Sequence, residues 1–300
     1  MKSERYLIPL AFFAIYVIWG ATYMLNKVAV NQLDPFYLAG IRFTIAGLLI
    51  FGIARINGSS LKLSWRQIRN TAFVGFLFLT YGNGVVVWAL KFVDSNFAAL
   101  EISAQPLVVL LLMWVLQGKK IKAKSMIGVF LGLVGMYLLI SQEQILMGPN
   151  SLLGVIMIFS CMLSWGYGSL FVATADLPRN YFVNTGFQMF FGGLMLLIAS
   201  LAFGEQWVSP IDWNADVQLV MIILVIFGSI AAFTSFNYLL KLVSPEKVAT
   251  STYVNPIIAM LLGWYVLKES ISMQSIIAAI VLLTGVYFIN SAKREKEKKG

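Results

Sequence analysis

The sequence predicts an all-α polytopic membrane protein with ten transmembrane helices, arranged as two inverted five-helix repeats with both termini in the cytoplasm. Three observations lead to this prediction. The 300-residue chain is 59% hydrophobic and only 12% charged, whereas about a quarter of the residues of a soluble domain are charged. Apolar runs of membrane-spanning length recur along the whole chain. Finally, the second half of the chain resembles the first.

Each predicted helix is an apolar run of about 20 residues, the length that crosses a hydrocarbon core. The first run continues past residue 20 without a small-residue cleavage site, so we expect a retained helix and not a signal peptide. The connections are short and leave no room for a soluble domain. In chain order the predicted spans are 6–29, 36–55, 70–91, 95–117, 125–142, 152–174, 181–203, 217–240, 246–267 and 272–291.

Basic residues predict the orientation of these helices, because cytoplasmic connections are rich in Lys and Arg. Most of the 22 Lys and Arg residues lie in the connections on one side or in the C-terminal tail. The opposite side carries only Lys91 and Lys268 among several acidic residues. Both termini are therefore expected in the cytoplasm.

An internal repeat divides the chain into a first five-helix unit (1–145), a second five-helix unit (146–292) and a basic cytoplasmic tail (293–300). Residues 96–140 align without a gap on residues 246–290. Because five is an odd number, the second unit enters the membrane from the opposite side, as in secondary transporters that bind substrate near the midplane between inverted repeats. Matched residues include Gln105-Pro106 with Asn255-Pro256, Trp19-Gly20 with Trp165-Gly166, Gly40 with Gly186, and Gly47 with Gly193.

The matched prolines, Pro106 and Pro256, predict helix kinks near mid-depth, because proline cannot donate a hydrogen bond to the helix. Irregular backbone at that depth is tolerated only where it is buried in protein or faces a cavity. A packing kink and a cavity wall both fit this pattern.

Apart from the first and last two residues of each span, three charged residues fall inside predicted spans: Lys27, Arg42 and Glu101. A charge at a helix centre costs about 2.5–3.5 kcal/mol on insertion scales, so such residues are functional candidates. The aligned positions of the second repeat carry Ala173, Gln188 and Ser251. The fold itself therefore does not require the three charges.

Two roles stay open for each charge. Arg42 either forms an ion pair with Glu101 or binds a substrate carboxylate, and a bidentate guanidinium suits both roles. Glu101 either is the partner of Arg42 or Lys27, or holds a substrate ammonium group or a coupling proton. Lys27 either contributes to the site or extends to the membrane interface.

Polar and aromatic residues at helical spacing predict a central cavity, although a single aromatic residue can instead pack or lie at the membrane interface. The candidate substrate-binding residues are Glu101, Arg42, Lys27, Trp19, Tyr23, Asn26, Tyr81, Asn83, Trp88, Gln105, Trp165, Asn237, Tyr238, Tyr253 and Asn255.

The composition argues against catalysis. Histidine is absent, Cys161 is the single cysteine, and no phosphate-binding glycine loop occurs. We therefore expect no catalytic residues, no metal site, no cofactor and no enzyme activity. The expected partners are a small-molecule substrate, the lipid bilayer and a coupling proton, without nucleic acid, and we expect a monomer. A channel or lipid scramblase is a competing class, which would leak substrate without saturation.

Several motifs resemble the drug/metabolite transporter superfamily, in its ten-helix EamA-type branch of bacterial inner-membrane exporters. The resemblance covers nearly the whole chain, and it implies a multi-pass location in the inner (plasma) membrane. The fourth span departs from the family pattern, because Leu116-Gln117-Gly118-Lys119-Lys120 lacks an acid that the second repeat retains as Glu269. The motifs are Trp19-Gly20-Ala21-Thr22-Tyr23, Ala39-Gly40-Ile41-Arg42-Phe43, Gly82-Asn83-Gly84, Ser164-Trp165-Gly166 and residues 244–272.

The expected function is secondary active transport of a small amphipathic metabolite, an amino acid or a related compound. Alternating access around the central cavity would move the substrate, and the resemblance implies export. Ammonium would bind at Glu101, and carboxylate at Arg42 or Lys27. The alternatives are an antiporter of phosphorylated sugars or nucleotide-sugar-like anions, which would need several cavity cations, and an exporter of cationic or drug-like compounds.

Overall fold

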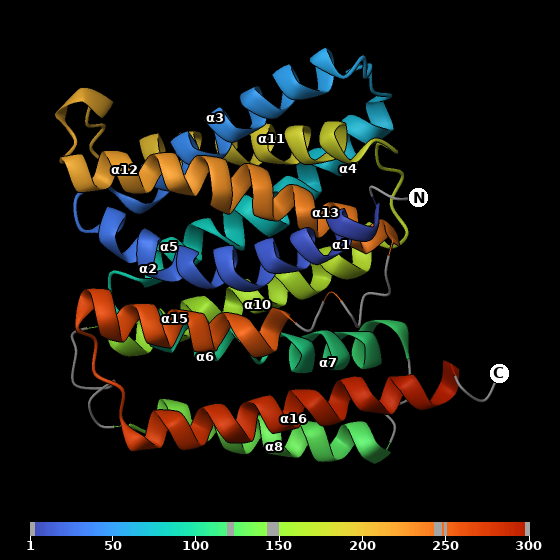
Figure 1. The fold of residues 1–300 in the computed structure, drawn as a ribbon, viewed down its shortest axis with the longest axis vertical. Helices are drawn as coiled ribbons and strands as arrows, with labels where there is room; N and C mark the ends of the chain where they lie inside the picture. The colour runs from blue at the N-terminus through green and yellow to red at the C-terminus, as the bar shows by residue number, and fades with distance from the viewer. Residues whose placement is uncertain (1–3, 119–122, 143–149, 243–247, 249–250, 298–300) are drawn as a thin grey trace.

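The computed structural model describes residues 4–118, 123–142, 150–242, 248 and 251–297. All regular structure in these residues is helical, and the helices lie side by side in one stack (Figure 1). The predicted repeat boundary at residues 145 and 146 and the last three residues of the tail lie outside the described residues. The helices of the first repeat are α1 (Glu4–Phe13), η1 (Ala14–Ile18), α2 (Trp19–Val30), α3 (Pro35–Ile56), α4 (Trp65–Gly75), η2 (Phe76–Tyr81), α5 (Gly84–Ala89), α6 (Ser95–Ile102), α7 (Gln105–Gln117) and α8 (Ala123–Ile140). Those of the second repeat are α10 (Ser151–Val172), α11 (Tyr181–Ala202), η3 (Pro210–Asp212), α12 (Ala215–Ile223), η4 (Leu224–Ala231), α13 (Ala232–Leu242), α15 (Ser251–Leu267) and α16 (Met273–Glu297).

Seven helical segments in the described part of the chain are long and apolar enough to cross a membrane. Three further apolar helices are shorter, and they coincide with the predicted fifth, ninth and tenth spans. These helices fit the predicted all-helical membrane protein, while the number of ten crossings and their orientation remain predictions. The seven segments are Tyr6–Val30, Pro35–Ile56, Trp65–Ala89, Ser95–Gln117, Ser151–Val172, Tyr181–Ala202 and Ala215–Leu239, and the shorter helices are Ser125–Leu139, Val254–Leu267 and Met273–Phe288.

Several spanning segments are interrupted. The π-helical segments η1, η2 and η4 lie within the first, third and eighth predicted spans, and such segments occur often at functional sites. The fourth span breaks at Ser103 and Ala104, so Pro106 lies in the first turn of a new helix, α7, where its missing N–H costs little. Pro256, in contrast, lies inside the continuous helix α15. The two matched prolines therefore have different local structures.

The equivalent helices α3 and α11 pack against each other through the glycines that the repeat alignment matched. A Cβ atom on Gly47 would lie 2.7 Å from the Phe190 nitrogen and 3.0 Å from the Gly186 oxygen. A Cβ atom on Gly193 would lie 2.4 Å from the Thr44 nitrogen and 3.0 Å from the Gly40 oxygen. Small residues let helix backbones approach this closely, so the aligned glycines of the two repeats face each other.

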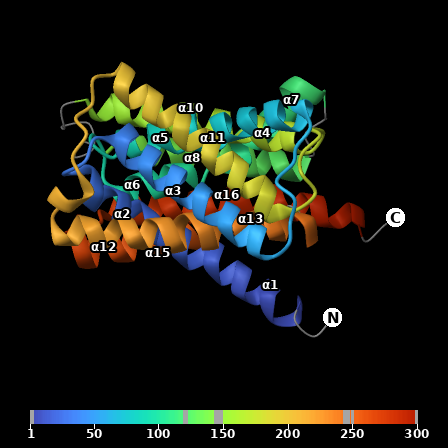
Figure 2. The same cartoon turned by 90° about the horizontal axis from the view of Figure 1, so that it is seen from above.

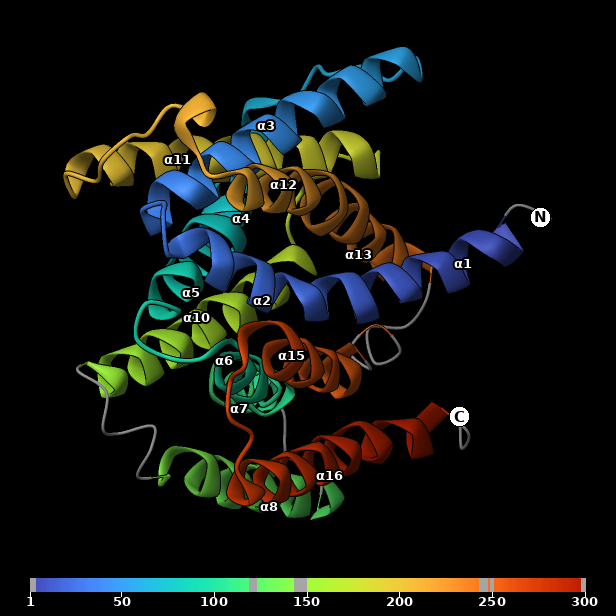
Figure 3. The same ribbon diagram turned by 60° about the vertical axis from the view of Figure 1, so that its left-hand side comes forward.

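A second pair of equivalent helices, α8 and α16, lies side by side at the edge of the stack (Figure 3). Glycines again allow the two backbones to approach closely, because a Cβ atom on Gly285 would lie 2.8 Å from the Gly128 oxygen. The beginning of α1 and the end of α16 lie at the same end of the stack (Figure 1 and Figure 2). We call this the basic end, since Arg55, Arg66 and Arg179 lie at or near the helix termini there, and the opposite end, with Asp34 and Asp94, the acidic end.

Candidate functional site

A cavity of about 860 Å³ is lined by residues of both repeats. Its walls include residues of α2, α3, α7, α10, α13 and α15, and of the π-helical segments η2 and η4. The lining extends to the connection after α10, where Ala175, Leu177 and Arg179 contribute. None of the described residues in the connections at the acidic end lines the cavity. The cavity therefore opens towards the basic end.

An aromatic cluster forms one wall of the cavity. Trp19 and Trp165, equivalent residues of the two repeats, meet edge to face with their ring centroids 6.3 Å apart. Phe236 lies 5.2 Å from Trp19 and 6.2 Å from Trp165, and Phe78 stacks on Trp165 at 4.5 Å. A Cβ atom on Gly82 would lie 2.5 Å from the Trp165 indole, so a glycine is needed to admit this ring.

Arg42 lines the cavity from α3 with 2% of its surface exposed. Its Nε donates to Ser229 Oγ at 2.8 Å and its Nη1 donates to Asn26 Oδ1 at 3.2 Å. Both partners are neutral, and the guanidinium also lies 4.7 Å from the centre of the Phe43 ring. Nη2 donates to none of the described residues. The expected ion pair with Glu101 is not formed, because neutral groups of α2 and η4 hold the guanidinium.

The amides that precede the two prolines bind the repeats to each other. Gln105 Nε2 donates to the Met162 carbonyl at 3.0 Å. The Asn255 amide is oriented so that both its oxygen and its nitrogen are satisfied, and its nitrogen then donates to the Tyr16 carbonyl at 2.7 Å. Tyr16 and Met162 are equivalent in the alignment that matches Trp19 with Trp165. Gln105 and Asn255 line the cavity and also make a symmetric pair of contacts between the repeats.

Further polar groups face the same cavity. Asn237 Nδ2 donates to Thr185 Oγ1 at 2.8 Å, and Tyr23 lines the wall beside Asn26. The Oδ1 atom of Asn83 is buried and has no hydrogen-bond partner among the described residues. The cavity thus combines one deep cation, several amides and aromatic faces.

Two of the predicted charges lie outside the cavity lining. The Lys27 ammonium group donates to the carbonyls of Leu90 and Val93, at 2.6 and 2.8 Å, which are free because α5 ends there. Glu101 has 0% of its surface exposed, and neither carboxylate oxygen has a hydrogen-bond partner in the described structure. Neither residue is in place to bind a substrate in this conformation.

Four more candidates also lie away from the cavity or cannot be placed. Tyr81 is partly exposed and donates to Ser160 Oγ at 3.2 Å. Trp88 packs in an aromatic group with Phe36 and Phe203, while Tyr238 contacts the Tyr181 ring. The side chain of Tyr253 lies outside the described residues.

The cavity includes residues that the sequence did not single out. Ser251 could have been found from the sequence, because it aligns with Glu101. Asn184 lies one helical turn from Gln188, whose amide donates a hydrogen bond to the Asn184 side-chain oxygen at 3.1 Å. The phenylalanines could not have been found from the sequence, since apolar residues in a membrane span also face lipid or neighbouring helices. The lining residues outside the candidate set include Thr22, Phe43, Phe78, Asn184, Phe233, Phe236 and Ser251.

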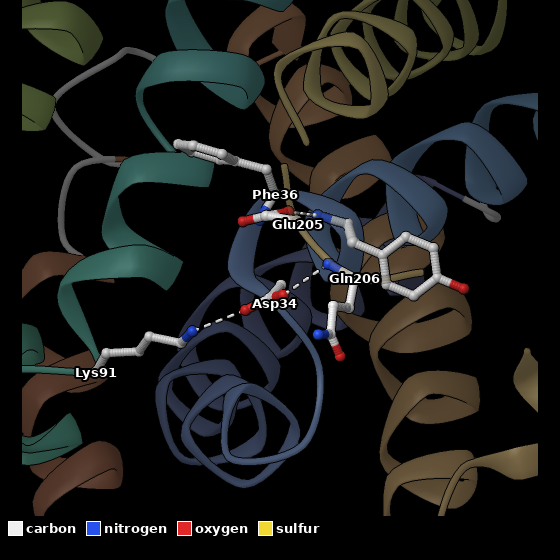
Figure 4. A network of polar contacts seen from close by, with 6 residues as sticks. Asp34, Phe36, Lys91, Glu205 and Gln206 are labelled. Carbon is white, nitrogen blue, oxygen red and sulfur yellow. Dashed lines mark hydrogen bonds and ion pairs between the residues drawn. The ribbon is translucent and has the colours of Figure 1, made fainter. Parts of the chain in front are cut away.

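The acidic end is closed by contacts between the repeats (Figure 4). The Glu205 carboxylate, from the second repeat, accepts hydrogen bonds from the Phe36 and Tyr37 nitrogens at 3.0 and 2.7 Å. Asp34 forms an ion pair with Lys91 at 2.9 Å and accepts a hydrogen bond from the Gln206 nitrogen. Partial burial raises the pKa of Asp34, but the Lys91 ammonium and the Gln206 N–H outweigh burial and hold this pKa below its usual value.

Glu269 closes the same end at a second place. Its carboxylate accepts hydrogen bonds from the Ser95 nitrogen at 2.9 Å and the Asn96 nitrogen at 3.1 Å. It therefore caps the positive end of α6, a helix of the other repeat. The aligned position in the first repeat, Lys119, lies outside the described residues.

Comparison with known proteins is informative once this geometry is established. A profile of the EamA-like transporter family matches the chain twice, over residues 7–141 and 152–291. The uncharacterized inner membrane transporter YedA of Escherichia coli (strain K12) is 32% identical over 96% of this chain and 93% of its own length. The S-adenosylmethionine/S-adenosylhomocysteine transporter of Chlamydia muridarum is 24% identical over 89% of this chain and 87% of its own. One crystal structure shares the fold, with a TM-score of 0.68 and 21% identity over 97% of this chain and 98% of the other.

Proposed function

The chain belongs to the EamA-like transporter family and is an inner-membrane transporter, and on this basis we propose that it moves a small amphipathic metabolite by secondary active transport. The substrate that we propose is an amino acid or a related compound. The observation that carries this proposal is the guanidinium of Arg42, a deep cation in the cavity wall whose hydrogen-bond acceptors among the described residues are both neutral.

Arg42 would bind the carboxylate of the substrate. A buried charge without an ionic partner is costly, and an incoming carboxylate would supply that partner. The Nη2 group, which donates to none of the described residues, is available for one of the new hydrogen bonds. Among the described lining residues Arg42 is the deep cation and Arg179 lies in the connection after α10, and one deep cation suits a carboxylate better than a phosphate group. This disfavours phosphorylated sugars as substrates.

The rest of such a substrate would contact neutral groups. Aromatic faces attract both apolar groups and cations, and Trp19, Trp165 and Phe236 provide them. The unpartnered Asn83 Oδ1 would accept a hydrogen bond from an ammonium group. This replaces the expectation of ammonium at Glu101, whose side chain does not reach the cavity in this conformation.

One relative supports an amino-acid derivative. The protein from Chlamydia muridarum is named as a transporter of S-adenosylmethionine and S-adenosylhomocysteine, and both compounds combine an amino-acid group with an aromatic base. A cavity of about 860 Å³ also accommodates molecules of that size. Alternating access between the repeats, starting from the opening at the basic end, would move the substrate out of the cell.

The test is counterflow with purified protein in liposomes, using a panel of radiolabelled amino acids and their derivatives. We expect saturable exchange of at least one carboxylate-bearing compound. The variant Arg42→Gln replaces the arginine by glutamine, the residue at the aligned position of the second repeat, Gln188. It should weaken the apparent affinity for that compound about tenfold or more, because a hydrogen bond to a charged group contributes about 1.5–3 kcal/mol.

The matched control is Arg55→Gln, which removes an exposed arginine at the other end of the same helix and should leave the affinity unchanged. Flux that does not saturate would indicate a channel and contradict the proposal. So would an Arg42→Gln variant with unchanged affinity for carboxylate substrates.

A further inference from the structure

Glu101 is the buried ionisable group that the transport proposal leaves unused. It lies in the last turn of α6 with 0% of its surface exposed. Neither carboxylate oxygen has a hydrogen-bond partner in the described structure. An ionised carboxylate in such a place is strongly disfavoured, whereas a protonated one is tolerated far better.

None of the described side chains around α6 neutralises this carboxylate. Helices α2, α8, α10 and α15 pack against α6. On α2, Tyr23 lines the cavity, and the Lys27 ammonium group donates its hydrogen bonds to the Leu90 and Val93 carbonyls. Cys161 on α10 is a buried thiol and carries no positive charge. The remaining described tyrosines on these helices are turned outward, namely Tyr137, Tyr167 and Tyr265.

The two described carboxylates at the start of α6 supply no positive charge either. Glu269 accepts hydrogen bonds from the Ser95 and Asn96 nitrogens, and Asp94 is exposed at the N-cap position. Glu101 therefore lies between this closed acidic end and the deep end of the cavity, where the next residue, Ile102, contributes to the lining.

The internal repeat indicates in which conformation the Glu101 side chain would contact water. Its equivalent, Ser251, lines the cavity in the present conformation, which is open at the basic end. If inverted repeats exchange conformations, a cavity open at one end becomes a cavity open at the other. Glu101 would then take the place that Ser251 has now, facing a cavity open at the acidic end. The turn at Ser103 and Ala104 separates α6 from α7 and would permit such a movement.

We propose that Glu101 is a proton-binding site reached from the acidic end, and that closing this end requires a proton on its carboxyl group. This inference rests on the proposed alternating-access function. In the state open at the acidic end, solvent hydrates Glu101 and the carboxylate ionises. On closure, the carboxylate takes up a proton from that side and enters the dry environment as a neutral acid.

Distance measurements test this without a known substrate. Spin labels are placed at Asn31→Cys of the first repeat and Ile211→Cys of the second, both exposed at the acidic end, in a Cys161→Ala background. The full chain is studied in lipid nanodiscs between pH 5 and pH 9. We expect the short distance of the closed end to dominate at low pH. The ratio of closed to open populations should fall by up to about tenfold per pH unit, as for a single proton.

Glu101→Gln should hold the closed distance at every pH, because its side chain is always neutral. Glu101→Asp keeps a carboxyl group and should therefore keep the pH dependence of the distance. That result would show that the loss of pH dependence in Glu101→Gln is not caused by a folding defect. The matched control Asp94→Asn removes an exposed carboxylate at the start of the same helix and should titrate like the wild type.

A Glu101→Gln variant that titrates like the wild type overturns the proton site. A wild-type distance that does not depend on pH overturns it too. Saturable counterflow by the same preparation leaves the proposed function standing in either case, whereas loss of saturable transport at all pH values contradicts the function itself.

Discussion

At the acidic end of the α3–α11 pair, a charge from one repeat caps a helix of the other. The Glu205 carboxylate binds the first free N–H groups of α3, and the Asp34–Lys91 ion pair lies beside it (Figure 4). At the basic end, the start of α11 is capped by its own Asn180, whose oxygen accepts from two nitrogens of the first turn. The described contacts between the repeats at this end include hydrogen bonds from Asn180 to Ser59 at 2.9 Å, from Gln67 to the Asp176 carboxylate at 3.3 Å and from Asn70 to the Asp176 carbonyl at 3.1 Å.

The two repeats thus share their helix packing but differ in the groups that cap their helices. The helix packing is the same at both ends, because aligned glycines make it. The capping groups differ, because Ser59 occupies the position that aligns with Glu205. In the α3–α11 pair, the helix start at the acidic end is thus capped by a charge from the other repeat and the helix start at the basic end by a local side chain, which agrees with a cavity that opens at the basic end.

The largest effect is expected from breaking the packing that both ends share. In Gly193→Ala the new methyl group would lie 2.4 Å from the Thr44 nitrogen, so backbone must move. We expect a loss of about 3 kcal/mol of stability, the upper part of the range for overpacking, measured by thermal melting of the purified protein. Gly52→Ala on α3 is the control, since nothing lies within 4 Å of its added Cβ atom. Equal melting temperatures for both variants would contradict the close packing.

A smaller effect is expected from removing the cap that only the acidic end has. Glu205→Ala leaves two N–H groups of α3 without their acceptors and should cost about 2 kcal/mol, as expected for a charged cap. Ser59→Ala at the aligned position should cost about 0.5 kcal/mol or less, since it removes one exposed neutral hydrogen bond. Chemical denaturation of both variants measures the difference. Losses of the same size would show that the two ends are held equally.

The smallest effect is expected from the exposed ion pair. Asp34→Asn should cost about 0.5 kcal/mol at neutral pH, because about a third of each side chain is exposed and water screens the pair. The folded-state pKa of Asp34 is lowered, so its contribution is present above the unfolded pKa and is lost as the pH falls through the folded value. Melting curves of variant and wild type should therefore converge in acid. A difference that persists there would assign the effect to something other than ionisation.

The sequence predicted the symmetric features best, because two copies of a pattern support each other. The aligned glycines and the amide–proline pairs both lie at contacts between the repeats. Alignment alone, however, could not show that Gly47 faces Gly186, or that Gln105 and Asn255 bind carbonyls of the opposite repeat. Those contacts depend on how the two units pack together.

The charged residues were harder to place, since sequence shows their depth but not their partners. Lys27 binds carbonyls that are free only because α5 ends at Ala89, and Arg42 binds a serine far away in the chain. The expected pairing of Arg42 with Glu101 was the simplest hypothesis that depth allowed. The structure instead leaves one charge facing the cavity and the other without a partner.

The contact between Trp19 and Trp165 has a geometric consequence. Equivalent residues that touch each other must lie on the pseudo-twofold axis that relates the repeats. A pair on this axis is its own image when the two repeats exchange conformations, so the separation of the two rings stays the same in both states. The contact between these two tryptophans should therefore be kept in both states, whereas contacts between residues that are not equivalent can change.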